Sequence, residues 1–151
     1  MKRFQLFFLI FILNACLAQP TPIPAPAESA PVVITQEENP YAPKPEDAGF
    51  IQAGVILTSL DLSEITDAAP ARTELTILGS MPGVCNELRI KVSLPNQAYE
   101  IFIEIYSIAN PKLKCENVFQ QFETSIMLGE YSAGVYSIWV NSSFVGNIVS
   151  Y

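Results

Sequence analysis

The side chains that could do chemistry are few, because the chain has three cysteines and no histidine. Without an imidazole there is no Ser-His-Asp or Cys-His pair, no histidine-ligated zinc and no ordinary general base near neutral pH. Paired acids such as Asp61 with Glu64, or Glu100 with Glu104, carry no specific signal for glycosidase chemistry or calcium binding. We therefore expect a protein that is not an enzyme and that uses no cofactor or metal.

The first cysteine, Cys16, ends a segment with the layout of a signal peptide. A basic start is followed by an apolar run at 4–13, about half of the ~20 residues that a stable membrane span needs. Residues 13–16, Leu-Asn-Ala-Cys, resemble a bacterial lipobox. The resemblance implies a signal peptide at 1–15, cleavage before Cys16 and attachment of lipid to its sulfur. Ordinary cleavage after Ala18, which would give a secreted protein, is the alternative.

The other two cysteines, Cys85 and Cys115, form an even set once Cys16 is taken by lipid. Export would place them in an oxidising compartment, so we expect a disulfide between them. Closing a loop of about thirty residues would add roughly 3–4 kcal/mol to the free energy of unfolding on the loop-entropy model. A redox or metal-binding pair is the alternative, but the sequence lacks Cys-x-x-Cys spacing and a supporting histidine.

A proline-rich segment at 16–49 separates the lipobox from the rest of the chain and holds eight of the twelve prolines. Repeated prolines favour extended polyproline II backbone at ~3.1 Å per residue, which makes a semi-rigid spacer. The alternative, a proline-rich docking ligand, is less well supported because no basic residue flanks the proline run. We expect a stalk that holds a folded domain away from a membrane.

The charge of the chain excludes one class of partner. Beyond Cys16 there are six Lys and Arg against fifteen Asp and Glu, a formal net charge of −9. Nucleic acid binding needs clustered positive charge, so we expect no nucleic-acid partner.

Residues 50–151 alternate apolar and polar side chains, which is typical of half-buried antiparallel strands. No long helical period follows the signal segment, so helices should be limited to a turn or two, near 64–69. Short strands separated by Pro, Gly, Asn and Asp predict an all-β antiparallel sandwich of about seven strands. The expected strands are 53–65, 73–79, 88–94, 99–106, 119–128, 135–141 and 144–150.

The two clearest strands, 88–94 and 99–106, predict a hairpin with Asn96 and Gln97 as its turn residues. In that register Val92 would face Ile101 in the core, and Arg89 would face Glu104 on the outer surface.

Three features within 54–149 resemble an exported bacterial domain to which no activity is assigned. They are Met-Pro-Gly-Val-Cys at 81–85, a second cysteine at 115 followed by Gln-Phe-Glu at 121–123, and Gly-Val-Tyr-Ser-Ile-Trp-Val-Asn at 134–141. The resemblance implies an immunoglobulin-like β-sandwich. The sequence departs from it at Gln121, where relatives tend to have proline, and at Ser142, where they tend to have the glycine of an Asn-Gly turn.

Four aromatic residues of the predicted strands divide into two groups. Tyr136 should be in the core, with its hydroxyl bonded to backbone at a sheet corner. Phe102, Tyr106 and Trp139 fall on the opposite face of their strands from the aliphatic residues. Exposed aromatics suggest a contact surface, and burial under loops or the stalk is the alternative.

These features predict a membrane-anchored envelope lipoprotein that binds another envelope protein through outward aromatics and edge strands. One alternative is a lipoprotein that binds a carbohydrate or small solute, which predicts a shallow aromatic groove near Trp139 or Phe102. Another is a secreted inhibitor-like domain that uses the loops at 82–86 and 110–117.

Overall fold

The computed structural model of the protein describes residues 39–67 and 71–151. The predicted signal peptide, Cys16 and the linker up to residue 38 lie outside the described residues. No helix in the described part is long and apolar enough to cross a membrane.

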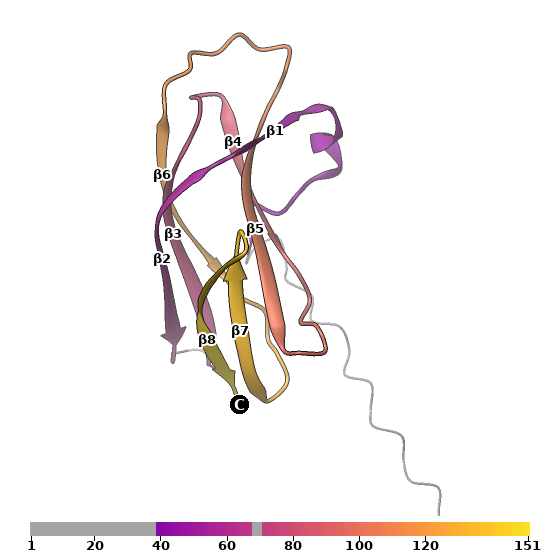
Figure 1. Ribbon diagram of the computed structural model, residues 1–151, viewed down its shortest axis with the longest axis vertical. Helices are drawn as coiled ribbons and strands as arrows, with labels where there is room; N and C mark the ends of the chain where they lie inside the picture. The colour runs from indigo at the N-terminus through magenta and orange to yellow at the C-terminus, as the bar shows by residue number, and fades with distance from the viewer. Residues whose placement is uncertain (1–38, 68–70) are drawn as a thin grey trace, which may run out of the picture.

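The described residues form a β-sandwich of two packed sheets, as Figure 1 shows. The first sheet contains β1 (Ile51–Gly54), β4 (Asn86–Val92), β5 (Glu100–Ala109), β7 (Gly134–Val140) and β8 (Ser143–Ser150). The second contains β2 (Ile56–Ile65), β3 (Arg72–Met81) and β6 (Gln120–Met127). The all-β sandwich predicted from the alternation is therefore confirmed.

The strand 53–65 was predicted as one element, but the chain changes sheets at Val55, so that β1 and β2 belong to different sheets (Figure 1). The described part of the chain thus has eight strands instead of about seven. The helical turn expected at 64–69 is wrong at its start, because Glu64 and Ile65 are the last residues of β2, while positions 68 and 69 lie outside the described residues.

Strand β5 is the centre of the first sheet. Strand β4 pairs antiparallel with one side of β5, while β7 and β1 share its other side. Strand β7 runs parallel to Glu100–Ile103, and β1 runs antiparallel to the later half of β5. The expectation of a purely antiparallel sandwich is therefore wrong at one strand pair, because β7 reaches β5 across the sandwich and not through a hairpin.

The core lies between the sheets and is mostly aliphatic. In β5 the inward residues Ile101, Ile103 and Ile105 are buried, and Phe102 and Glu104 between them are exposed, as the period of two requires. Removal of each such side chain from water contributes roughly 1.5–3 kcal/mol to folding. The other sheet supplies Leu75, Ile77 and Ile126 to the same cluster, and Leu128, directly after β6, also belongs to it.

The β4–β5 hairpin has a different register from the predicted one. Val92 pairs with Ile103, not with Ile101, and Lys91 is opposite Glu104 in place of Arg89. The turn is wider than two residues because the Asn96 carboxamide oxygen accepts hydrogen bonds, both 2.9 Å long, from the backbone N–H groups at positions 98 and 100. The register moves by two residues, so the side chains within β4 and β5 keep their predicted faces. Leu94 and Tyr99, which were expected to face each other in the core, lie beyond the two strands and are exposed.

The β7–β8 turn is tight despite the absence of glycine. Val140 pairs with Ser143, which leaves Asn141 and Ser142 as the two turn residues. Their φ angles are 45° and 69°, in the left-handed region that a two-residue hairpin turn with strand-compatible twist requires. The turn therefore places a serine where glycine would be favoured.

The last residues of the predicted linker lie against the sandwich. The buried Asn39 side chain donates to the carbonyl of Ile90 at 2.8 Å, and the Ile90 N–H donates to the carbonyl of Tyr41, also at 2.8 Å. These bonds cover backbone on the free side of β4. The folded part that the structure describes therefore begins at Asn39, before the predicted boundary at 50.

A short 3₁₀ helix, η1 (Pro45–Gly49), follows and lies beside β4 and β5 (Figure 1). Its Asp47 carboxylate accepts two hydrogen bonds from the Arg89 guanidinium, each 2.8 Å long. Arg89 is only 5% exposed, although the predicted register had placed it on the open outer face. The Arg89 hydrogen bonds lower the pKa of Asp47 to about 2 and raise that of Arg89.

The expected disulfide between Cys85 and Cys115 is present, with the two Cα atoms 6.0 Å apart. Cys85 lies in the β3–β4 connection and Cys115 in the β5–β6 connection. Figure 1 shows these two connections at the same end of the sandwich. The bond therefore joins two loops that each cross from one sheet to the other.

Candidate functional site

Three aromatic side chains form a row across the outer face of the first sheet. We call Phe102, Trp139 and Phe144 the aromatic strip. The Phe102 and Trp139 rings are nearly parallel, with centroids 6.4 Å apart and planes 22° apart. The Phe144 ring meets Trp139 edge-on at 5.4 Å. Such pairs add to the stability that the burial of each ring provides, and so hold the rings in one arrangement.

Strand pairing explains why these three residues meet. The parallel register of β5 and β7 places Phe102 beside Trp139, and the antiparallel register of β7 and β8 places Trp139 beside Phe144. Side chains of paired residues lie on the same face of a sheet. Residues that are 42 positions apart in sequence thus become neighbours on three adjacent strands.

The strip is an exposed apolar surface. Phe102 is 42% exposed and Phe144 is 53% exposed. Trp139 lies between them and is partly buried, and its indole N–H is enclosed without an acceptor among the described residues. A donor of this kind costs folding free energy, and such exceptions need a structural or functional explanation.

The predicted contact residues are not all brought together. Phe102 and Trp139 belong to the strip, whereas Tyr106 pairs with Gly54 and Arg89 farther along β5 and is only partly exposed. Phe144 was not among the predicted contact residues. The signal was available, because a two-residue turn at Asn141 and Ser142 places Phe144 opposite Trp139.

Tyr136 has the architectural role that was expected of it. Its side chain is buried against Tyr99 and Tyr131, and its hydroxyl donates to the carbonyl of Ser132 at 2.8 Å. Burial raises the pKa of the neighbouring Tyr131 to about 12. Tyr131 and Tyr136 therefore belong to the interior, and Tyr99 covers Tyr136 from the surface.

The acidic residues beside the strip are part of a solvated face. Glu104 pairs with Lys91 at 3.4 Å, and Glu100 accepts a hydrogen bond from Asn96 at 2.8 Å. Among the residues that the structure describes, no three His, Cys, Asp or Glu side chains are grouped as they would be to hold a metal ion.

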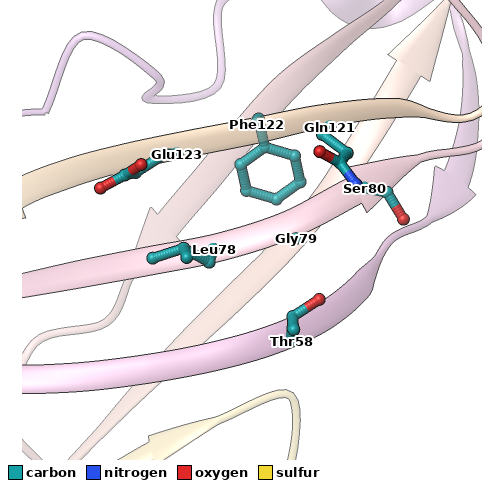
Figure 2. A pocket seen from close by; sticks show the side chains of 7 residues that line it. All are labelled: Thr58, Leu78, Gly79, Ser80, Gln121, Phe122 and Glu123. Carbon is teal, nitrogen blue, oxygen red and sulfur yellow. The ribbon is translucent and has the colours of Figure 1, made fainter.

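A pocket of about 300 Å³ lies on the other sheet, where β2, β3 and β6 pass side by side (Figure 2). Gly79 is one of the lining residues. A larger side chain is excluded there because its Cβ atom would collide with the backbone of Ile56 and the ring of Phe122. Glu123 is the one titratable side chain in the lining, so the pocket holds no acid–base pair. Neither Phe102 nor Trp139 lines this pocket, so the aromatic groove expected of a solute-binding site is not found here.

The loops joined by the disulfide carry a second group of exposed apolar residues: Val84, Leu113, Val118 and Phe119. Phe119, directly before β6, is the most exposed of them at 63%. These residues lie in the two connections that the disulfide joins and not on the face of the first sheet that carries the aromatic strip.

Comparison with known proteins adds no relative to this description. No family model matches the sequence, and neither the curated proteins nor the solved structures contain a match. The resemblance to an exported bacterial domain therefore stays a prediction from the sequence motifs.

Proposed function

We propose that this chain is an exported, lipid-anchored accessory protein whose immunoglobulin-like sandwich binds another envelope protein through the aromatic strip. The observation that carries the proposal is the row formed by Phe102, Trp139 and Phe144 on adjacent strands. Aromatic residues are enriched at the centres of protein interfaces because they bury a large area while losing little conformational freedom.

The shape and surroundings of the strip favour a protein over a small solute. The rings lie on the face of a sheet, and the pocket on the second sheet is lined by none of them. The flanking Glu104, Lys91 and Asn147 supply the polar rim that protein interfaces have around an apolar centre.

The remaining parts of the proposal come from the sequence. The lipobox-like residues 13–16 support attachment through Cys16, and the proline-rich segment supports display at a distance from the membrane. Mass spectrometry of the mature protein tests this part. A diacylated or triacylated Cys16 at the N-terminus supports the anchor, and an unmodified N-terminus at Gln19 contradicts it.

Site-specific photo-crosslinking in the producing cells tests the partner. Benzoylphenylalanine at position 102 or 144 should give a discrete crosslinked protein, whereas the same group at exposed Ser59 on the second sheet should not. Equal crosslinking from all three positions, or none from 102 and 144, would contradict a protein interface at the strip.

The glycan alternative has its own measurement, because Trp139 is the single tryptophan of the chain. Its fluorescence reports directly on the aromatic strip. A shift of the emission on titration with envelope polysaccharide, combined with no crosslinked protein, would assign the strip to a carbohydrate.

A further inference from the structure

We propose that the free edge of β6 accepts an extended segment of another protein, which adds to the second sheet as a fourth strand. This inference concerns the opposite sheet from the aromatic strip and is independent of the function proposed for that strip. It rests on how the five sheet edges are protected, on the backbone groups that β6 presents and on the charge around it.

Five strands form sheet edges in the described part of the chain, and four of them are short or protected: β1 has only four residues, and β2, β8 and β4 carry a bulge or a covering segment. Unpaired edges invite pairing with other chains, and proteins prevent this with bulges or with covering segments. In β2 the register with β3 shifts between Leu57 and Ser59. In β8 the register with β7 shifts between the pairs Trp139–Phe144 and Ile138–Gly146. The segment that begins at Asn39 covers part of β4.

Strand β6 has none of these devices within the described residues. It pairs with β3 over eight consecutive positions without a register shift, and it is the last strand of its sheet. It contains no proline and a single charged residue, Glu123. A long, regular, nearly uncharged edge is the kind of edge to which a further strand adds.

The backbone groups at this edge follow from the ladder. The Leu128 N–H donates to the Thr73 carbonyl at 2.8 Å, one step beyond the β3–β6 register. Because hydrogen-bonded pairs alternate in an antiparallel ladder, the even-numbered residues of β6 face β3. The odd-numbered residues direct their N–H and carbonyl groups to the free edge; they are Gln121, Glu123, Ser125 and Met127.

The side chains around the edge indicate what kind of segment fits. Toward the interior, Phe122 and Thr124 are only partly buried, so an added strand would find apolar surface to cover. On the outer face Glu123 is accompanied by Glu74 and Asp61, and the only Lys or Arg in the three strands of this sheet is Arg72 at one end. A segment with apolar residues inward and Lys or Arg outward would therefore match both the apolar inner surface and the acidic outer face beside β6.

The same features disfavour a second copy of this chain as the occupant. The protein is acidic overall, and a second β6 would bring another Glu123 to an acidic face. Like charges placed across a strand pair oppose association, whereas a basic segment is attracted.

Amide hydrogen exchange measured by NMR tests the proposal on the mature chain, with Cys16→Ser so that it is soluble without lipid. The probe is the acetylated and amidated peptide Thr-Lys-Val-Lys-Val-Lys-Thr. At saturating peptide the exchange of the Glu123 and Ser125 amides should slow at least about tenfold, because these amides gain acceptors. The Glu64 amide, on the free side of β2, should be unaffected, and so should Trp139 fluorescence.

Two matched variants separate strand addition from general stickiness. Ser125→Pro removes one edge donor and no backbone hydrogen bond to β3, and its loss of the hydroxyl contact with Thr76 is shared by Ser125→Ala. Proline is tolerated at such edge positions, so the fold should persist while peptide binding is lost. Ser125→Ala keeps the N–H and should bind the peptide as the parent chain does. Glu64→Pro places the same change on the β2 edge and should also leave binding intact.

Charge is tested separately. Glu123→Lys should weaken binding of the basic peptide and strengthen binding of the same peptide with Glu in place of Lys. The proposal is overturned if the Glu123 and Ser125 amides gain no protection, or if Ser125→Pro binds as well as the parent chain. Protection that appears without peptide and grows with protein concentration would assign the edge to a second copy and overturn it as well.

Discussion

The Asn141 side chain continues the β5–β7 pairing beyond the end of β7 through two hydrogen bonds to Ile105. Its carboxamide oxygen accepts from the Ile105 N–H at 2.8 Å, and its carboxamide nitrogen donates to the Ile105 carbonyl at 2.9 Å. The side chain therefore provides hydrogen-bond partners for the N–H and carbonyl of Ile105, which lies in β5 between the residues paired with β7 and those paired with β1. The Val-Asn end of the 134–141 motif thus has a structural role.

Replacement of Asn141 by glycine should lower the free energy of unfolding by about 2 kcal/mol. Glycine accommodates the φ of 45° at this position, so the loss reports the two side-chain hydrogen bonds and the unpaired backbone of Ile105. Urea denaturation measures the change. As a control, Asn147→Ala on exposed β8 should change stability by less than about 0.5 kcal/mol. An Asn141→Gly variant as stable as the parent would contradict this role.

Ser142→Gly should stabilise the protein by about 0.5–1 kcal/mol. Ser142 has a φ of 69°, a conformation that strains residues with a Cβ atom and that glycine adopts freely. Thermal and urea unfolding measure the gain. The matched control is Ser143→Gly, one position later and inside β8. Glycine relieves no strain there and only raises the conformational entropy of the unfolded chain, so this substitution should destabilise the protein. Equal effects of the two substitutions would rule out strain as the cause.

Stability should fall in acid because of Asp47. Its pKa is lowered from 3.8 to about 2 in the folded state, so the charged form stabilises the fold above pH 3.8. This contribution is lost as the pH falls from 3.8 toward 2. Asp47→Asn should cost about 2–3 kcal/mol at neutral pH because it leaves the buried Arg89 with a weaker partner.

Unfolding curves of the two proteins across this pH range test the prediction. The difference in stability between parent and Asp47→Asn should shrink as the pH approaches 2, since protonated Asp47 resembles asparagine. Glu87→Gln is the control, because Glu87 also bonds Arg89, at 3.0 Å, but has a side chain 57% exposed. It should cost less than about 1 kcal/mol. A pH-independent difference would show that Asp47 stabilises by packing and not by charge.

Short-range patterns predicted much of the fold and part of the aromatic strip. The alternation assigned the side chains of 88–92 and 100–106 to the correct faces, although the register between the two strands differed from the predicted one. Phe102 and Trp139 were recognised as outward residues for the same reason. Phe144 was missed because its partner depends on the exact turn and not on the alternation of its own strand.

The sequence by itself determined the strands, their inward faces and the cysteine pair, because these depend on a period of two along the chain and on cysteine number. The tertiary structure decided which strands meet. The parallel contact of β5 with β7, the sheet change at Val55 and the burial of Arg89 against Asp47 all join residues far apart in sequence. A strand shows the same alternation of apolar and polar residues whichever strand it pairs with, and after any shift of register by an even number of residues. Only the packed sandwich therefore distinguishes among the possible strand pairings and registers.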